Sequence, residues 1–473
     1  LQRFQAGDSE AGEWLDAFVA LGDKLKVCVE DLKKKLHEAK STPSVGALVR
    51  ECFAQRCVPR ATYRLQFNRH FTFRDALALI PYLHELGISH CYASPIFKAR
   101  LGSEHGYDVC DHSRLNPDLG TEDDFRRLTE GLRELGMGLI LDVVPNHMGI
   151  GDVGNGWWMD VLENGASSVY APCFDIDWDP VNPVLSQKVL LPVLGDQFGK
   201  ALEAGQIRLA YESGAFFLSY FGLTLPAEPR TYIPILEQHL TRLAGVLDAE
   251  HPHVQELRSI MTSLSHLPLR TETSAEKIAE RQREKEVIKR RLATLCGGDP
   301  VVQKTLLDTV EQFNGTVGDP RSFDLLEALL EQQPYRLAYW RVATEEINYR
   351  RFFDINELAA IRTENPTVFK ATHQLVLRLL TEGGVCGLRV DHPDGLWNPA
   401  EYFRRLQEEY VLAWVRARLP GERIPEDLEQ RVATCFAERM AERCGQRGAW
   451  PLYVVAEKIL CGDEPLPKEW AVD

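Results

Sequence analysis

Three apolar runs of the sequence each end on, or close to, an acidic side chain. They read "LDVVPNHMG" (141–149), "LRVDHPDG" (388–395) and "VVAEKIL" (454–460). Apolar runs without alternation are typical of strands that are buried on both faces of a parallel sheet. Such sheets have their binding crevice at the C-terminal edge of the strands. Because desolvated carboxylates repel one another, three of them at one edge indicate cationic partners or a catalytic use.

The second and third runs carry residues suited to nucleophilic and acid catalysis. Arg389 stands two residues before Asp391, so both side chains project from the same side of a strand. Charge-assisted hydrogen bonds from Arg389 would hold Asp391 ionised. Glu457 has no cation beside it on its own strand face, because Lys458 should point the other way. We therefore expect Glu457 to carry a proton that it can donate to a leaving oxygen.

An ionised aspartate facing a protonated glutamic acid across a cleft is the pair used in retaining glycoside chemistry. The aspartate attacks the anomeric carbon, and the glutamic acid protonates the leaving group and later acts as base. Two unrelated buried ion pairs are the alternative interpretation of the same residues.

Two further segments fit a sugar substrate. "SEHGYDV" (103–109) contains His105, Tyr107 and Asp108, and "NGWWMDVLENG" (155–165) contains Trp157 and Trp158. Aromatic rings suit the apolar face of a pyranose, and polar neighbours suit its hydroxyl groups. A pair of tryptophans belongs more often to a hydrophobic core than to a sugar platform, so this segment has two interpretations.

Other chemistries lack a motif. There is no GxSxG elbow, no GxxxxGK[ST] loop and no GxGxxG after a strand. His105, His112 and His147 have no recognised metal spacing, and no oxygen-rich loop suggests calcium. The 11 cysteines are scattered, and they form no CxxC pair. We expect no cofactor and no metal, and cysteines that act as small apolar fillers in a reduced cytoplasmic setting.

Composition limits the partners. The 473 residues carry a net charge of −15, which argues against nucleic acid or an anionic membrane surface. No apolar stretch approaches a membrane span, and the N-terminus lacks a signal-peptide core. The chain begins with Leu and stops at "KEWAVD", so we expect a piece of a longer polypeptide.

The elements that must position the acids alternate between strand and helix. Strands are expected at 61–67, 90–96, 138–144, 387–391 and 452–460, with amphipathic helices between them. Thr121 is the expected N-cap of the second helix, and Gly87 ends the first. This order predicts the α/β class with a parallel sheet and right-handed crossovers.

Four regions follow from these patterns. Residues 1–58 are an N-terminal helical extension, 59–146 and 366–473 form the sheet, and 147–365 is an insertion. Within the insertion, residues 207–220 predict a β-hairpin, and 274–295 predict a very charged helix, which we interpret as a solvated helical hairpin.

The sequence resembles the α-amylase superfamily of glycoside hydrolases and transglycosylases. "DVVPNH" is similar to its first signature, "GLRVDH" to its second and the strand of Glu457 to its third. The resemblance is closer to the trehalose-forming branch, the maltooligosyl trehalose synthases. The segments that carry it are "ATYRLQF", "HGYDV", "WWMDVLENG", "FDIDW", "LLPVLG", "INYRRFFDINELAAIR", "DHPDGL" and "EKIL", and they cover nearly everything from Pro59 onwards.

The resemblance implies an eight-stranded (β/α)8 barrel, of which this chain holds about five units, with a large insertion after the third strand. It implies Asp391 as nucleophile, Glu457 as general acid/base and Arg389 as the partner of Asp391. The residues that we expect near the substrate are His105, Tyr107, Asp108, Asn146, His147, His392, Asp394, Lys458, Trp157 and Trp158. The third catalytic acid of the superfamily has no match before Asp473, and residues 1–58 lie outside the resemblance.

The implied reaction is intramolecular transglycosylation. The reducing-end α-1,4 bond of a maltooligosaccharide becomes an α,α-1,1 bond, with retention through two inversions. A plain α-glucan hydrolase would use the same residues, and a non-catalytic glucan-binding fragment would lack turnover. We expect a further polypeptide segment to complete the barrel.

Overall fold

The computed structural model describes residues 20–22, 24–27, 29, 43–419, 424–443, 446 and 448–473. The chain forms two compact units. Residues 1–56 and 407–452 make the first, and residues 57–406 and 453–473 make the second. Most of the expected N-terminal helical extension lies outside the described residues.

The first unit is helical where it is described. Helix α3 (Val45–Ala54) begins at Ser44, whose hydroxyl accepts the N–H of Ala47. It packs against α16 (Leu428–Glu442), and the rings of Phe53 and Phe436 lie 5.9 Å apart. The sequence patterns separated these helices into different regions, because apolar periodicity alone does not show which distant helix covers an apolar face.

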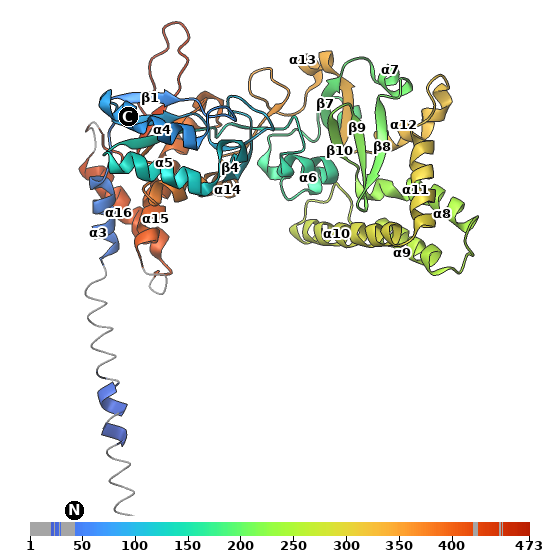
Figure 1. The fold of residues 1–473 in the computed structure, drawn as a ribbon, viewed down its shortest axis with the longest axis horizontal. Coiled ribbons are helices and arrows are strands. Elements are labelled where there is room, and N and C mark those ends of the chain that lie inside the picture. The colour runs from blue at the N-terminus through green and yellow to red at the C-terminus, as the bar shows by residue number, and fades with distance from the viewer. Residues whose placement is uncertain are drawn as a thin grey trace, which may run out of the picture. The chain divides into compact units, whose positions relative to one another are not determined.

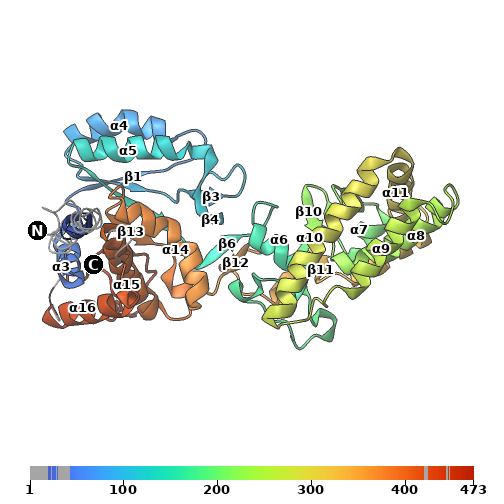
Figure 2. The same cartoon turned by 90° about the horizontal axis from the view of Figure 1, so that it is seen from below.

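The second unit contains a five-stranded parallel sheet, whose first strand is labelled β1 in Figures 1 and 2. Its strand order is β1-β2-β5-β13-β14, and every neighbouring pair is parallel. The strands are β1 (Thr62–Leu65), β2 (His90–Ala93), β5 (Gly138–Val143), β13 (Gly387–Val390) and β14 (Tyr453–Ala456). All five expected strands and their parallel pairing are therefore confirmed.

Helices connect these strands. They are α4 (Phe73–Glu85), α5 (Glu122–Glu134), α14 (Pro366–Thr381) and α15 (Pro399–Arg418). Thr121 caps α5 as expected, in a reciprocal capping box with Asp124. Gly87, at φ +85°, follows α4 in the left-handed conformation that favours glycine. Helices α4 and α5 lie side by side along the sheet (Figure 2).

The expected insertion contains smaller sheets and helices around its own core. Strands β8 and β9 form the expected hairpin, with Ser213 and Gly214 in the turn. Further short strands pair as β10-β9, β11-β7, β12-β6 and, before the insertion, β3-β4. The remaining elements are β3 (Phe97–Ala99), β4 (Val109–Leu115), β6 (His147–Gly149), α6 (Gly156–Asn164), β7 (Val189–Leu194), α7 (Phe198–Glu203), β8 (Ile207–Glu212), β9 (Ala215–Tyr220), β10 (Leu223–Pro226), α8 (Tyr232–Ala244), α9 (Pro252–His266), α10 (Ala275–Gly298), α11 (Pro300–Phe313), α12 (Asp324–Glu331), β11 (Tyr335–Tyr339), α13 (Ala343–Glu346) and β12 (Leu358–Ala360).

The charged helix α10 differs from the expected solvated hairpin. Arg281 and Lys285, on its buried face, are each only 1% exposed. Arg281 pairs with Glu228 at 2.5 Å, and Lys285 pairs with Glu163 at 2.5 Å and with Asp160 at 3.1 Å. The solvated interpretation was therefore wrong for this face, because the acidic partners stand on distant segments and no pattern within the helix reveals them.

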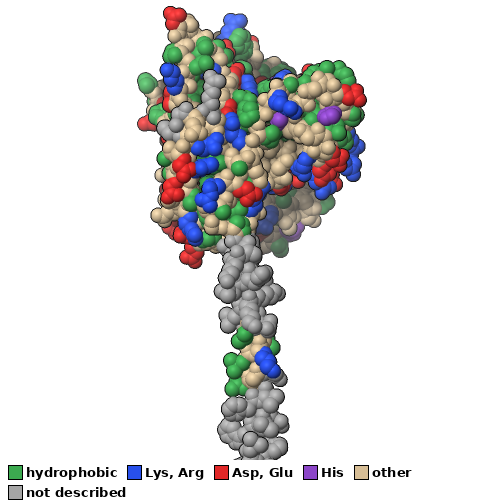
Figure 3. Space-filling model, turned by 90° about the vertical axis from the view of Figure 1, so that its left-hand side faces the viewer, with side chains coloured by type: hydrophobic (Ala, Val, Ile, Leu, Met, Phe, Trp, Pro, Cys, Tyr) green, Lys and Arg blue, Asp and Glu red, His purple; other side chains and the backbone are tan. Residues whose placement is uncertain are grey.

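None of the described helices is both long and apolar enough to cross a lipid bilayer. On the face drawn in Figure 3, acidic and basic side chains are interspersed.

Candidate active site

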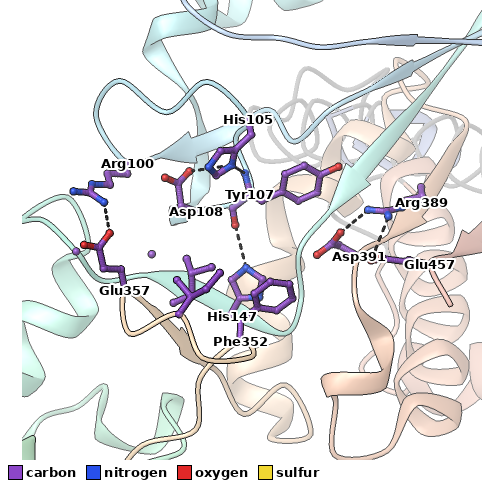
Figure 4. Close-up of a pocket in the computed structure, with 14 residues that line it drawn as sticks. Arg100, His105, Tyr107, Asp108, His147, Phe352, Glu357, Arg389, Asp391 and Glu457 are labelled. Atoms are coloured by element: carbon purple, nitrogen blue, oxygen red, sulfur yellow. Dashed lines mark hydrogen bonds and ion pairs between the residues drawn. The ribbon is translucent and has the colours of Figure 1, made fainter. Parts of the chain in front are cut away.

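A cleft of about 470 Å³ opens at the C-terminal end of the parallel sheet (Figure 4). Its size is typical of a small-molecule or sugar site. Apolar and charged side chains share its wall, with Arg389, Asp391 and Glu457 at one side. The lining residues are Arg100, His105, Tyr107, Asp108, His147, Gly149, Gly151, Phe352, Ile355, Glu357, Leu358, Arg389, Asp391 and Glu457.

Strand register brings the acidic residues together. Arg389 on β13 stands opposite Asp142 on β5, and Val390 stands opposite Ala456 on β14. Asp391 and Glu457 are each the next residue, so they leave adjacent strands at the same level. Adjacent strands lie about 4.8 Å apart, which places the two acidic side chains close together.

Arg389 contacts all three carboxylates. Its Nη1 donates to Asp391 Oδ1 at 2.6 Å and to Asp142 Oδ1 at 2.9 Å. Its Nη2 lies 3.3 Å from Glu457 Oε2. One positive charge therefore lies beside three carboxyl groups. Because three negative charges would repel one another more than one guanidinium can offset, the three acids together favour binding a proton.

Asp142 is a buried anchor of this network. Its side chain is fully buried, and its Oδ2 accepts hydrogen bonds from the hydroxyls of Tyr92 and Tyr107, both at 2.6 Å. Burial raises the pKa of Asp142, and Arg389 opposes that change. The sequence placed Asp142 at the strand edge but did not assign its partners, since the tyrosine contacts join residues 50 and 35 positions apart.

Asp391 is less readily ionised than we expected. Burial raises its pKa to about 7, and repulsion by Asp142 and Glu457 acts in the same direction. Arg389 lowers the pKa, but its charge is shared with Asp142, so it does not cancel the cost of burial. The expectation of an aspartate held firmly ionised by Arg389 is corrected on this point.

Glu457 has a cationic neighbour, Arg389, that the sequence did not reveal. Arg389 reaches it from the neighbouring strand, and the backbone N–H of His392 donates to its Oε2 at 3.0 Å. We expected no cation on the strand face of Glu457 itself; Arg389 reaches Glu457 from the neighbouring strand, which that expectation did not consider. His392 itself takes a left-handed conformation, at φ +42°, that presents this N–H.

The segment around Tyr107 forms the opposite wall, as Figure 4 shows. His147 is 1% exposed, and burial lowers its pKa to about 3, so the ring is neutral. Its Nε2 is 3.2 Å from the carbonyl oxygen of Tyr107 and donates to it. His105 and Asp108 also line the cleft. The structure thus brings His105, Tyr107, Asp108 and His147 to the same cleft as Asp391 and Glu457.

Other expected substrate residues lie outside the lining. Trp158 is 1% exposed in the core of the insertion, with its ring against Phe174. Trp157 stacks on Tyr170 at 5.2 Å. The core interpretation of this pair therefore describes Trp158 better than the sugar-platform interpretation.

The remaining expected residues contact the loops that follow the sheet strands rather than the cleft. Asn146 Oδ1 accepts from Arg350, which also donates to the carbonyl of Gly395 at 2.6 Å. Lys458 pairs with Asp394 at 3.1 Å and with Glu464 at 2.7 Å. These contacts connect the segments that follow β5, β13 and β14, so their effect on the cleft is indirect.

Several lining residues were not singled out from the sequence. Phe352 packs its ring on His147 at 4.5 Å and on His392 at 4.8 Å. Glu357 pairs with Arg100 at the rim of the cleft. Phe352 and Glu357 belong to the run "INYRRFFDINELAAIR", whose resemblance was noted without roles for its members.

Comparisons with known proteins show what the chain as a whole resembles. Residues 77–179 match the α-amylase catalytic-domain family. A Mycobacterium tuberculosis protein named "Putative maltooligosyl trehalose synthase" is 32% identical over 357 residues, which is 74% of this chain and 33% of that protein. The solved maltooligosyltrehalose synthase of Arthrobacter ramosus is 30% identical with a TM-score of 0.54, over 88% of this chain and 36% of that one.

A structure described as "DSM5389 glycosyltrehalose synthase" is 28% identical with a TM-score of 0.53, over 87% of this chain and 39% of that one. The chain thus spans about a third of the length of the relatives that it matches. The resemblance expected from the sequence is confirmed: this chain is similar to about a third of a maltooligosyl trehalose synthase, and its residues 77–179 match the α-amylase catalytic-domain family.

Proposed function

We propose that this chain supplies the nucleophile and the acid/base of a (1→4)-α-D-glucan 1-α-D-glucosylmutase, an isomerase that acts on maltooligosaccharides. The observation that carries the proposal is the Asp391–Arg389–Glu457 group at the cleft, in a chain similar to trehalose-forming enzymes. Adjacent strands bring the two carboxyl groups close, which favours the short separation of retaining enzymes (about 5–5.5 Å) over the longer one of inverting enzymes.

The first half of the reaction breaks the reducing-end α-1,4 bond. A carboxylate oxygen of Asp391 attacks C1 of the penultimate glucose, and Glu457 gives its proton to O4 of the leaving glucose. A covalent glycosyl ester on Asp391 and one free glucose result. Arg389 compensates the changing charge of both carboxyl groups, since it contacts both.

The second half joins the same two sugars differently. The released glucose turns so that its O1 faces the ester, and Glu457 removes the proton from that hydroxyl. O1 attacks C1 of the glycosyl group, the bond to Asp391 breaks, and an α,α-1,1 linkage forms. Two inversions at C1 give net retention, and no water is consumed.

The glucose must stay in the cleft between these halves, and water must be kept from the ester. His105, Tyr107, Asp108 and His147 are suited to hold the attacked glucose, whose C1 forms the ester, because they line the same cleft as the acids. Phe352 supplies an apolar surface beside them. We assign these four histidine, tyrosine and aspartate side chains to the subsite of the attacked glucose, next to which the released glucose must stay.

The five strands are, in this proposal, the first units of an eight-stranded barrel that a further polypeptide segment closes. Strands β1 and β14 are the two edges of the sheet, and an unpaired edge favours pairing with another strand. The third catalytic acid would stand on that segment. The nine described cysteines are free thiols, which suits a reduced cytoplasmic setting.

Product analysis tests the proposal. The complete enzyme that contains this chain, incubated with maltopentaose, should yield a non-reducing product of unchanged mass. A rise in reducing ends with a gain of water would instead identify an α-glucan hydrolase. Binding of maltopentaose without turnover would identify a glucan-binding protein.

A further inference from the structure

A cluster of two cysteines and a histidine lies at the N-terminal ends of the sheet strands, and the cleft lies at their C-terminal ends. Cys57 precedes β1, His90 is the first residue of β2, and Cys386 directly precedes β13. The ligand atoms of the three side chains lie within 4.8 Å of one another. Among the residues that the structure describes, this is the one such group of His, Cys, Asp or Glu side chains.

The cluster is separate from the active site. Cys386 stands just before β13 and Asp391 just after it. A strand of this length separates them by about 15 Å, so no ligand in the cleft reaches the thiols. The proposed transglycosylation uses none of these three residues.

The surrounding backbone leaves space for the cluster. Gly138, the first residue of β5, stands between His90 on β2 and the segment that carries Cys386. A Cβ at residue 138 would lie 2.4 Å from His90 Cδ2 and 2.6 Å from Cys386 Sγ. Both side chains therefore occupy the volume that a side chain at this position would need.

The side chains are held with their ligand atoms turned toward one another. His90 is 5% exposed, and its Nδ1 is 3.0 Å from Ser89 Oγ. Ser89 Oγ is itself fixed by the backbone N–H groups of Arg60 and Ala61. This orients the ring so that His90 Nε2 lies 3.1 Å from Cys57 Sγ. An anchored second ring nitrogen is the usual support of a histidine that binds a metal.

We propose that Cys57 Sγ, His90 Nε2 and Cys386 Sγ bind a zinc ion, with water in the fourth position. Zinc takes thiolate and imidazole ligands at about 2.3 Å and 2.0 Å in a tetrahedron, which places ligand atoms about 3.5–3.8 Å apart. Cys57 Sγ and His90 Nε2 lie 3.1 Å apart, and all three ligand atoms lie within 4.8 Å of one another, so small side-chain movements give that geometry.

Zinc binds cysteine as the thiolate, so the ion would displace thiol protons of Cys57 and Cys386 as it binds. The ion would tie together the starts of β1, β2 and β13 over the glycine that begins β5.

Cobalt and zinc titration of the whole chain, kept reduced and stripped of metals, tests this proposal. Co²⁺ should give thiolate charge-transfer bands and the intense visible bands of a tetrahedral site, and one equivalent of Zn²⁺ should abolish them. Cys57→Ser and Cys386→Ser should each lower zinc affinity by more than the about 10- to 100-fold that loss of an outer partner costs. The control Cys461→Ser, an exposed cysteine outside the cluster, should leave the affinity unchanged.

A weak octahedral Co²⁺ spectrum, or equal zinc affinity in Cys57→Ser and the unchanged chain, would overturn the proposal. Alkylation of the unchanged chain provides a measurement that needs no variant. Zn²⁺ should slow modification of Cys57 and Cys386 and leave that of Cys461 unaltered. Equal alkylation of Cys57 with and without Zn²⁺, or a Cys57–Cys386 disulfide that persists in the reduced chain, would refute a zinc site.

Discussion

Asp391 determines how the proposed reaction should respond to pH. Attack needs the carboxylate, and the pKa of Asp391 is raised to about 7. Below that pH the group is protonated, so activity should fall as the pH drops through about 7. The acid limb of kcat/KM, which reports the free enzyme, should therefore lie near 7 rather than near the usual aspartate value of about 4.

Asp142→Asn tests the cause of that raised pKa. The change removes one repelling charge and leaves Arg389 to Asp391 and Glu457, and both effects lower the pKa of Asp391. The acid limb of kcat/KM should move to lower pH. A limb that stays near 7 in the variant would show that burial alone controls Asp391.

Asp391→Asn and Glu457→Gln separate the two catalytic roles. Loss of the nucleophile should lower kcat by about 10⁴-fold or more, by analogy with other covalent mechanisms. Loss of the acid/base should cost about 10²- to 10⁴-fold. Steady-state kinetics of the complete enzyme measure both, with the exposed Asp123→Asn as control. Near-normal turnover in either variant contradicts the assignment.

The sequence predicted part of the site at residue scale. Asp391, Glu457, Arg389 and the Tyr107 segment could be found, because acids at strand ends and short motifs are visible along the chain. The charge balance could not be found. Sharing of Arg389 among three carboxylates depends on strand register, which joins residues more than 200 positions apart.

At the scale of elements, α10 should depend on its buried ion pairs. Lys285→Met leaves Glu163 and Asp160 without a buried cation, although Lys289 still contacts Glu163. Breaking one partner of a buried pair costs about 3–5 kcal/mol of unfolding free energy, and Lys289 should keep the loss toward the lower figure. Urea unfolding measures the loss.

Lys277→Met, at the exposed start of the same helix, is the matched control and should change stability little. Adding Glu163→Gln to Lys285→Met should recover part of the loss, because it removes one unpaired charge. Equal stability of Lys285→Met and the unchanged chain would show that water or another cation compensates these acids.

The central sheet was predictable for a physical reason that does not extend to α10. Both faces of a parallel strand are buried, so β5 and β13 appear as short apolar runs between helices with their own caps. The partners of Arg281 and Lys285 lie 53 and 122 residues away, and no local period encodes them. The members of the Cys57–His90–Cys386 cluster are also far apart in the sequence, so their spacing did not predict a shared site.

At the scale of the molecule, the insertion contributes to the cleft as well as to its own core. Strand β12 pairs with β6, which follows closely after β5, the strand that carries Asp142. That pairing places the segment around Phe352 beside His147 and His392. A long insertion that returns to the active site explains how one chain could both hold a released glucose and limit access of water.

Phe352→Ala should therefore change the fate of the glycosyl ester rather than its formation. The ring of Phe352 packs on His147 and His392 and forms no part of the hydrogen bonds that hold the two catalytic acids. Asp391 and Glu457 should therefore stay in place in the variant. Its removal opens space in which water can compete with the released glucose. In the complete enzyme, the ratio of free glucose to non-reducing product from maltopentaose should rise several-fold, while total bond cleavage falls less.

Trp340→Ala, which changes an exposed aromatic residue elsewhere in the insertion, is the control and should leave that ratio unchanged. An unaltered ratio in Phe352→Ala would mean that the insertion does not exclude water at this position.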